Sequence, residues 1–250
     1  MDKALYIAMS GAKHNMRAQT VHANNLANVN TTGFKADFAR ARSMPIYFGE
    51  GHPTRAYALE EIPATDFRQG PLVETGRDLD VAVEGDGFIA VQSPDGTEAY
   101  TRAGSLFIDA LGMLRTGNGL PVLGNGGPIA IPAADKVEIS GDGSITVIAL
   151  GQGVDAPVQV DRIKLVNPPT DTIQRGIDGL IHLLDDEQGE LPADGNVRII
   201  SGFVEGSNVS AVNELTSVMS LARQYEMQVK IMQTVKEDSE ASARLLQPAS

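Results

Sequence analysis

Mostly apolar residues at both ends of the chain recur at alternating steps of four and three. Near the N-terminus the repeat runs through Leu5, Met9, Ala12, Met16, Gln19, Ala23 and Leu26. Near the C-terminus it runs through Ala211, Leu215, Val218, Ala222, Tyr225, Val229 and Met232. A repeat of 3.5 residues keeps these side chains on one seam of a helix, which is typical of coiled coils. The pattern predicts a helix at each end, the second over residues 209–246 with a length of about 57 Å.

The middle of the chain has the opposite character. Residues 43–208 contain 24 of the 26 glycines and 12 of the 13 prolines, which interrupt helices and form turns. Short β-prone runs alternate with turn sequences such as Gly141-Asp142-Gly143. These runs are 81–83, 88–91, 99–101, 106–108, 129–131, 137–139, 145–150, 163–166 and 180–184. We predict an α+β fold in which a mainly-β central domain, barrel-like or sandwich-like, spans residues 36–208 between helical segments 1–35 and 209–250.

The two end helices are expected to pair with each other. Asn208 follows the helix breaker Gly206 and is predicted to cap the second helix. The alternative is that each helix packs on its own β domain, but the small and flexible seam residues favour contact between helices. We expect both ends to be poorly ordered in the monomer and to fold together in an assembly.

Charge and composition narrow the range of functions. The chain has 32 acidic and 20 basic residues, a net charge of −12, which argues against nucleic acid or an anionic membrane as a partner. It has no cysteine, which excludes disulfides and thiolate metal sites. No apolar run approaches the roughly 18 residues of a membrane helix, and no cleavable leader is visible. We therefore expect no membrane insertion: the protein is either soluble or exported without a cleaved leader.

Enzymatic motifs are weak. Residues 85–90 match GxGxxA, but strand and turn residues follow where a dinucleotide site requires a helix, so a hairpin explains the glycines better. Asp78 and Asp80 suggest calcium, yet Ala82 and Glu84 do not complete a calcium loop. The histidines are dispersed along the chain at His14, His22, His52 and His182. We expect no catalytic residue, cofactor, metal or small-molecule substrate.

One stretch carries a resemblance to a known family. The sequence Ala23-Asn24-Asn25-Leu26-Ala27-Asn28-Val29-Asn30-Thr31-Thr32-Gly33-Phe34-Lys35 closely resembles the N-terminal signature of the flagellar axial family of rod and hook proteins. Further similar stretches are 79–83 with 85–88, 100–105, 112–116, 205–209 and 225–227. The resemblance implies a tubular polymer in which the terminal helices form an inner layer and the β domain lies outside.

The resemblance also implies a cellular location and binding partners. It is strongest to the branch that forms the proximal part of the rod, on the basis of chain length, the Met-Asp start and Gly206; a distal rod or hook sibling is the alternative. The expected location is the rod of the basal body, where it spans the periplasm. The expected partners are proximal and distal rod subunits, copies of the same chain and the flagellar type III export apparatus. An enzyme or a ligand-binding β protein is the alternative of another class.

The functional residues predicted by these patterns form an assembly interface. The amides of the signature can bond neighbouring chains, Gly33 permits a left-handed turn, and Phe34 anchors the chain. The predicted interface residues are Leu5, Met9, Ala12, Met16, Ala23, Asn24, Asn25, Leu26, Asn28, Gly33, Phe34, Asn208, Leu215, Val218, Ala222, Tyr225, Val229 and Met232.

Overall fold

The computed structural model describes residues 2–39, 41–45, 56–60, 64–149, 157–184 and 189–245. The chain forms two compact units. The first unit consists of Met1–Ala27, Asp37–Asp66 and Ser210–Ser250, and the second consists of Asn28–Ala36 and Phe67–Val209. Both units are therefore built from segments that are far apart in the sequence.

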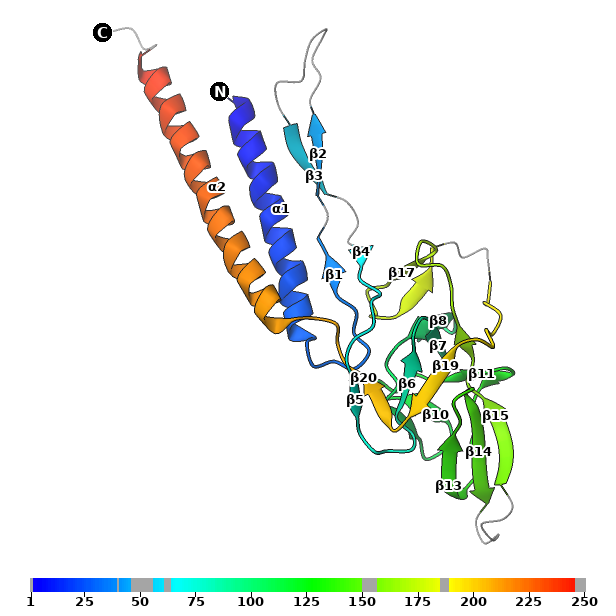
Figure 1. The fold of residues 1–250 in the computed structure, drawn as a ribbon. Helices are drawn as coiled ribbons and strands as arrows, with labels where there is room; N and C mark the ends of the chain where they lie inside the picture. Colours follow the sequence, from blue (N-terminus) through cyan, green and yellow to red (C-terminus); the bar gives the residue numbers. More distant parts are fainter. Residues whose placement is uncertain are drawn as a thin grey trace. The chain divides into compact units, whose positions relative to one another are not determined.

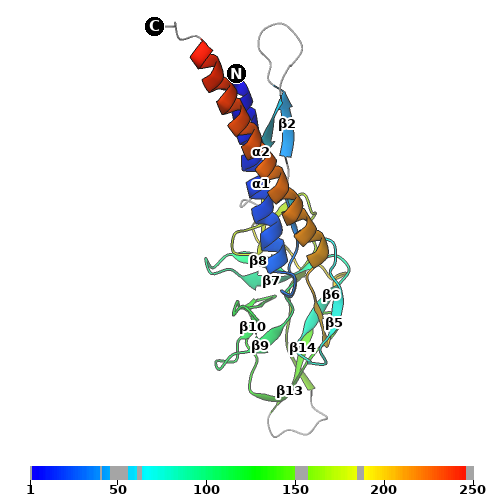
Figure 2. The ribbon, with the colours of Figure 1, turned by 90° about the vertical axis from the view of Figure 1, so that its left-hand side faces the viewer.

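The first unit is mainly a pair of long helices. Helix α1 (Asp2–Ala27) and helix α2 (Ala211–Leu245) lie side by side and run antiparallel (Figures 1 and 2). At about 1.5 Å per residue, α1 is roughly 39 Å long and α2 roughly 52 Å. A hairpin of β2 (Ala41–Pro45) and β3 (Ala56–Glu60) packs along α1, and β1 (Asp37–Phe38) pairs with β4 (Ala64–Thr65).

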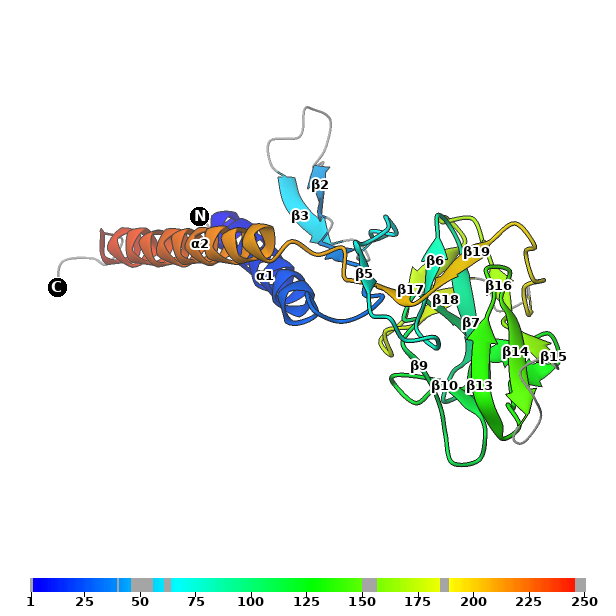
Figure 3. The ribbon, with the colours of Figure 1, turned by 60° about the horizontal axis from the view of Figure 1, so that its bottom comes forward.

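The second unit contains the remaining strands. They are β5 (Leu72–Glu74), β6 (Val81–Glu84), β7 (Phe88–Gln92), β8 (Glu98–Thr101), β9 (Leu106–Ile108), β10 (Leu114–Thr116), β11 (Leu123–Gly124), β12 (Gly127–Pro128), β13 (Ala134–Ile139), β14 (Ser144–Ala149), β15 (Pro157–Arg162), β16 (Leu165–Val166), β17 (Ile173–Arg175), β18 (Ile181–Leu183), β19 (Arg198–Ser201) and β20 (Phe203–Glu205). The largest sheet has the order β16-β7-β8-β18-β17, and β13, β14 and β15 form a three-stranded meander (Figures 1 and 3). β9 pairs with β10, β11 with β12, β6 with β19 and β5 with β20, and every ladder is antiparallel.

The core of the second unit follows from the alternation of side chains along each strand. On β7, Ile89 and Val91 enter the larger apolar cluster, whereas Phe88 and Ala90 enter a smaller one on the other side. All four side chains are buried, so this sheet is covered on both faces. The fold class is confirmed at the level of terminal helices and a mainly-β middle region. Among the described residues, however, no ladder closes into a barrel.

One expected strand is largely wrong. In place of a strand over 129–131, the structure has β12 at Gly127–Pro128 and only an isolated bridge between Ala130 and Met113. Prolines at 128 and 132 flank this run, and proline cannot donate a ladder hydrogen bond. Ile129 is nevertheless fully buried, so the apolar run still contributes to the core.

The start of β6 runs directly against the segment that follows β8. The Val81 amide donates to the Gly104 carbonyl at 2.8 Å, and Asp80 forms a bridge with Ser105. A Cβ atom placed on Gly104 would lie only 1.7 Å from the Val81 carbonyl oxygen. The two backbones can approach this closely only because Gly104 has no side chain.

Gly104→Ala is therefore expected to lower the free energy of unfolding by about 2–4 kcal/mol, because the backbone must move to admit the methyl group. Thermal and urea unfolding followed by circular dichroism measure the change. Gly126→Ala is the matched control, because its Cβ meets nothing within 4 Å; we expect a change below about 0.5 kcal/mol. Wild-type stability of Gly104→Ala would contradict this contact.

Candidate functional site: a buried charge network and an apolar helix stripe

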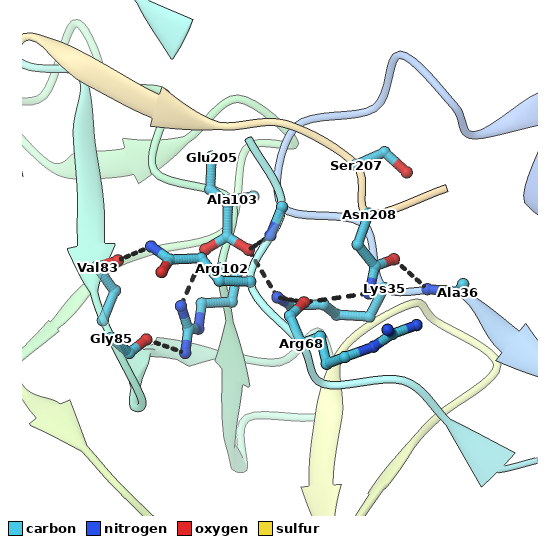
Figure 4. A network of polar contacts seen from close by, with 12 residues as sticks. Lys35, Ala36, Arg68, Val83, Gly85, Arg102, Ala103, Glu205, Ser207 and Asn208 are labelled. Carbon is cyan, nitrogen blue, oxygen red and sulfur yellow. Dashed lines mark hydrogen bonds and ion pairs between the residues drawn. The ribbon is translucent and has the colours of Figure 1, made fainter. Parts of the chain in front are cut away.

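The carboxylate of Glu205, at the end of β20, is completely buried and held by two cations (Figure 4). Its Oε1 accepts hydrogen bonds from Lys35 Nζ at 2.6 Å and from the Gly70 amide at 2.9 Å. Its Oε2 accepts one from Arg102 Nη1 at 2.9 Å. Lys35 and Arg102 are buried as well. We call these three charged side chains the Glu205 network.

Both cations have further partners that hold them in place. Lys35 Nζ also donates to the Arg68 carbonyl at 2.8 Å, and Arg102 Nη2 donates to the Gly85 carbonyl at 2.8 Å (Figure 4). The Arg102 guanidinium also lies 5.0 Å from the centre of the Phe88 ring. A buried charge is tolerated when it is paired and hydrogen-bonded, and these contacts satisfy Lys35 Nζ and both terminal nitrogens of Arg102, whereas the buried Arg102 Nε has no hydrogen-bond partner.

The backbone around the network is packed as tightly as its side chains. The Gly33 amide donates to the Glu205 carbonyl at 2.7 Å. Gly33 has φ of +69°, and a Cβ there would lie 2.3 Å from the Ala103 nitrogen. A Cβ on Gly70 would lie 2.1 Å from the Gly206 carbonyl oxygen. The left-handed turn predicted at Gly33 is thus confirmed, and close backbone approach is a second reason for glycine at this position.

Phe34 and Lys35 are also held from the β17–β18 hairpin. The Arg175 guanidinium lies 4.6 Å from the centre of the Phe34 ring, and its Nη1 donates to the Lys35 carbonyl at 3.0 Å. Cation–π contacts of this kind favour arginine over an aromatic face. Phe34 is therefore in contact with its own β domain, which accounts for an anchoring role within the chain.

The predicted capping role of Asn208 is wrong. Helix α2 begins at Ala211, and the Asn208 side chain instead accepts a hydrogen bond from the Ala36 amide and donates to the Arg68 carbonyl, at 2.8 and 3.1 Å. The Ser210 carbonyl accepts the first helical bond, from Glu214. The Asn208 amide has both a donor and an acceptor, so it joins two other segments of the second unit, and this explains the discrepancy.

The residues that α1 buries within the first unit are small or polar. The buried residues among positions 4–27 of α1 are Ala8, Ala12, Asn15, Ala18 and Asn25. Across the seam, His22 Nδ1 lies 2.5 Å from a Glu214 carboxylate oxygen. The side chain of Gln228 lies over Gly11, where a Cβ would be 3.2 Å from its Nε2.

The large apolar residues of the predicted seam on α1 lie mostly outside this contact. Leu5, Met9 and Met16 are 37%, 52% and 61% exposed. Ala23 is exposed, Leu26 is half-buried, and only Ala12 is fully buried. The 3.5-residue repeat therefore marks a side of α1 that its own partner helix leaves largely uncovered.

The residues of the predicted seam on α2 are likewise partly buried and partly exposed. Val218, Ala222, Val229 and Met232 are half-buried against the rest of the unit. Leu215 and Tyr225 are 51% and 39% exposed, and Met219, which the repeat did not include, is 51% exposed.

The exposed residues of the two helices lie on one side of the pair. Residues advance about 100° along an α-helix, so Leu5, Met9 and Met16 fall within about 40° of each other, and so do Leu215 and Met219. Around its own helix axis, each set lies roughly 100–180° from the residues that contact the other helix, and the direction of this rotation is the same for both helices. Because the helices are antiparallel, rotations in the same direction bring both sets to the same side of the pair. We call these five residues the apolar stripe.

The signature amides have separate positions. Asn25 is buried, and its side chain exchanges two hydrogen bonds with the Asp37 backbone, at 2.8 and 3.0 Å. Asn24 is exposed on α1. Asn28 lies in the second unit, where its Oδ1 accepts a hydrogen bond from the Thr31 hydroxyl. The Asn25 amide is thus used within the chain, and Asn24 is the most accessible of the three.

The candidate enzymatic features have structural explanations. The GxGxxA residues Gly85 and Gly87 form the turn between β6 and β7, both with positive φ, and a strand follows them. Within the described ranges, no three His, Asp or Glu residues gather so that they could hold a metal ion. No helix in that part of the chain is long and apolar enough to cross a membrane.

The second unit also has a surface pocket of about 460 Å³ between β11 and residues 190–193. Glu98 and Lys164, which pair at 2.5 Å, are among its lining residues. Burial, followed by the nearby Glu98 carboxylate, raises the pKa of the Tyr100 hydroxyl well above its usual value. The hydroxyl therefore stays protonated at neutral pH, which does not favour a role as a base or nucleophile.

Comparison with known proteins identifies the family. The model "Flagella basal body rod protein" matches residues 5–35, "Flagellar hook protein FlgE/F/G D1 domain" matches 82–147, and "Flagellar basal body rod FlgEFG protein C-terminal" matches 200–245. The flagellar basal-body rod protein FlgF of Escherichia coli K12 is 39% identical over 250 residues, which cover 98% of this chain and 99% of that protein. The chain belongs to the flagellar basal-body rod protein family.

Other members of the rod protein family are similar over nearly the full length. FlgF of Caulobacter vibrioides is 34% identical over 252 residues, 98% of both chains. FlgG of Bacillus subtilis is 33% identical over 266 residues, 95% of this chain and 96% of that one. These relatives are named as flagellar basal-body rod proteins, which fits the interpretation that this rod protein is not an enzyme.

The Glu205 network draws one charge from each of the three matched segments. Lys35 is the last residue of the first, Arg102 lies in the second, and Glu205 lies near the start of the third. All three residues lie in the stretches that carry the family resemblance, but no role was predicted for them from the sequence. The pattern that could have identified them is a charged residue within an otherwise apolar or glycine-rich motif, because charges at such positions are candidates for buried pairs.

Glu205→Gln is expected to lower the free energy of unfolding by about 3–5 kcal/mol, because it keeps the shape of the side chain but leaves two buried cations without a counter-charge. Urea unfolding of the purified rod protein measures the loss. Glu190→Gln is the control, since Glu190 is 80% exposed and 3.9 Å from Lys164; its effect should stay below about 0.5 kcal/mol. Equal stability of the two variants would contradict the importance of the network.

Proposed function

We propose that the rod protein, a structural subunit of the flagellar basal-body rod, occupies the proximal part of this rod, in the periplasm, and assembles with its neighbours through its terminal helices. Its partners are then copies of the same chain and other proximal and distal rod subunits. The observation that carries the proposal is the apolar stripe, which the chain's own helix pair leaves exposed.

The energetics of the stripe support polymerisation. Leu5, Met9, Met16, Leu215 and Met219 are each roughly half exposed. Completing their burial against a neighbouring helix offers about 4–8 kcal/mol per subunit before the cost of ordering. The heptad-like repeat of the stripe suits coiled-coil packing between helices of adjacent copies. A surface of this kind on a long helix pair is a docking surface for another helix pair rather than for a small molecule.

The seam within the pair supports coupling of folding to assembly. Ala8, Ala12, Asn15 and Ala18 bury little apolar surface, so the pair gains little stability from its own contact. Polar links such as His22 to Glu214 orient the helices but add modest free energy. The two helices therefore depend on neighbouring copies for most of their burial.

In a dilute monomer, the amides of α1 and α2 are expected to exchange with solvent much faster than those of β7 and β14. In an assembled rod the helix amides should become protected, because helix opening then requires loss of contacts with other copies. Hydrogen exchange read by mass spectrometry, on monomer and on purified basal bodies, makes the comparison. Strong protection of both helices in the monomer would argue against coupled assembly.

The second unit suits the outer part of a rod. It carries 21 acidic and ten basic residues, a net charge of −11, which favours a solvated surface. The Glu205 network fixes the segments 28–36 and 203–209, which continue toward α1 and α2, to the β domain by buried ion pairs. Both segments are thus held firmly within the second unit, which suits a part that carries mechanical load.

The main alternative is that the chain is a distal rod subunit of the same family. Relatives named FlgG match at 30–34% identity over 94–95% of this chain, so a distal position is the second candidate. The observations that favour the proximal position are the FlgF relatives at up to 39% identity and nearly complete coverage of both chains.

Leu215→Asp is expected to abolish motility and incorporation into basal bodies while the β domain stays folded, because a carboxylate on the stripe cannot be buried without a partner. Complementation of a strain lacking the gene, with motility halos and immunoblots of basal bodies, provides the measurement. Ser220→Asp is the matched control, because it introduces the same charge at an exposed position on the opposite flank of α2. Normal motility of Leu215→Asp would contradict the proposed interface.

A further inference from the structure

Methionine makes up much of the apolar stripe. Met9, Met16 and Met219 are all more than half exposed. The chain has no cysteine, so methionine thioethers are its only sulfur groups open to oxidation. Because susceptibility follows exposure, these three side chains are accessible targets in the free subunit.

The three sulfurs share one face. Met9 and Met16 are seven residues apart, two turns of α1, and Met219 lies on the same side of the pair on α2. Met227 is equally exposed, at 55%, but lies about 80° further around α2, toward the opposite flank. The chain thus supplies an internal comparison between methionines inside and outside the stripe.

We infer that Met9, Met16 and Met219 form an oxidation-sensitive site that controls whether a subunit can assemble. The inference rests on the proposed role of the stripe as the assembly surface. Oxidised subunits are excluded from the rod, whereas subunits already in the rod have these sulfurs covered and resist oxidation.

The chemistry requires only a peroxide. A thioether sulfur attacks one oxygen of hydrogen peroxide, an S–O bond forms, the O–O bond breaks, and water is released. Sulfur is oxidised by two electrons and the peroxide is reduced. The sulfoxide is a polar acceptor on a surface that must become dry, and burying it without a donor opposes assembly. Sulfoxide reductases can restore the thioether, so the change is reversible.

Protection can be measured directly. The free full-length subunit and basal bodies from the same strain are treated with hydrogen peroxide, and sulfoxide is quantified by peptide mass mapping. We expect oxidation of the three stripe methionines to be at least about tenfold slower in basal bodies. Equal rates would overturn the inference alone, whereas absence of the chain from basal bodies would overturn the proposed function and the inference with it.

A second experiment tests the consequence for assembly. The variant Met9→Leu/Met16→Leu/Met219→Leu keeps apolar volume and helix propensity but cannot be oxidised. Wild type, this variant and Met227→Leu are each induced in a strain lacking the gene during a sublethal peroxide pulse. Motile cells are counted with and without the pulse, and we expect the treated-to-untreated ratio of the triple variant to be at least about threefold that of wild type or Met227→Leu. Equal losses in all three strains would overturn the inference, because peroxide would then act elsewhere.

Discussion

A fully buried carboxylate held between two cations organises the second unit. Glu205 is 170 residues from Lys35 and 103 from Arg102, and each pair is within hydrogen-bonding distance. Removing Glu205 would leave two buried cations without a counter-charge, which costs far more than an intact pair contributes. Residues 28–36 and 203–209 therefore take their places in the second unit only when the β domain is formed.

The two units differ in how completely they bury their apolar surface. The second unit is complete in itself, because its sheets enclose apolar clusters and its buried charges are paired. The first unit places alanine and polar residues in its seam and leaves larger apolar side chains outside. Under the proposed function, neighbouring copies in the polymer supply the contacts that the first unit lacks.

The sequence was sufficient for the coarse fold and insufficient for the pairings. Glycine, proline and the 3.5-residue repeat separated helical ends from a β middle, because these signals are local. The repeat identified an apolar side of α1 but not the helix that covers it. Within the unit, α1 instead buries residues outside the repeat, such as Ala8 and Asn15. Asn208 looked like a cap because local sequence favours it, whereas its partners lie 140 and 172 residues away. Pairs of residues that are far apart in the sequence, such as Lys35 and Glu205, produce no periodic pattern that a single sequence could reveal.

The glycines around Glu205 have a mechanical consequence. Glycine usually adds flexibility, yet at Gly33, Gly70 and Gly104 a neighbouring backbone occupies the place where a side chain would be. These contacts, all within the second unit, are made by main chain against main chain. Since backbone rather than rotatable side chains fills these gaps, the second unit itself is expected to deform little when the rod turns.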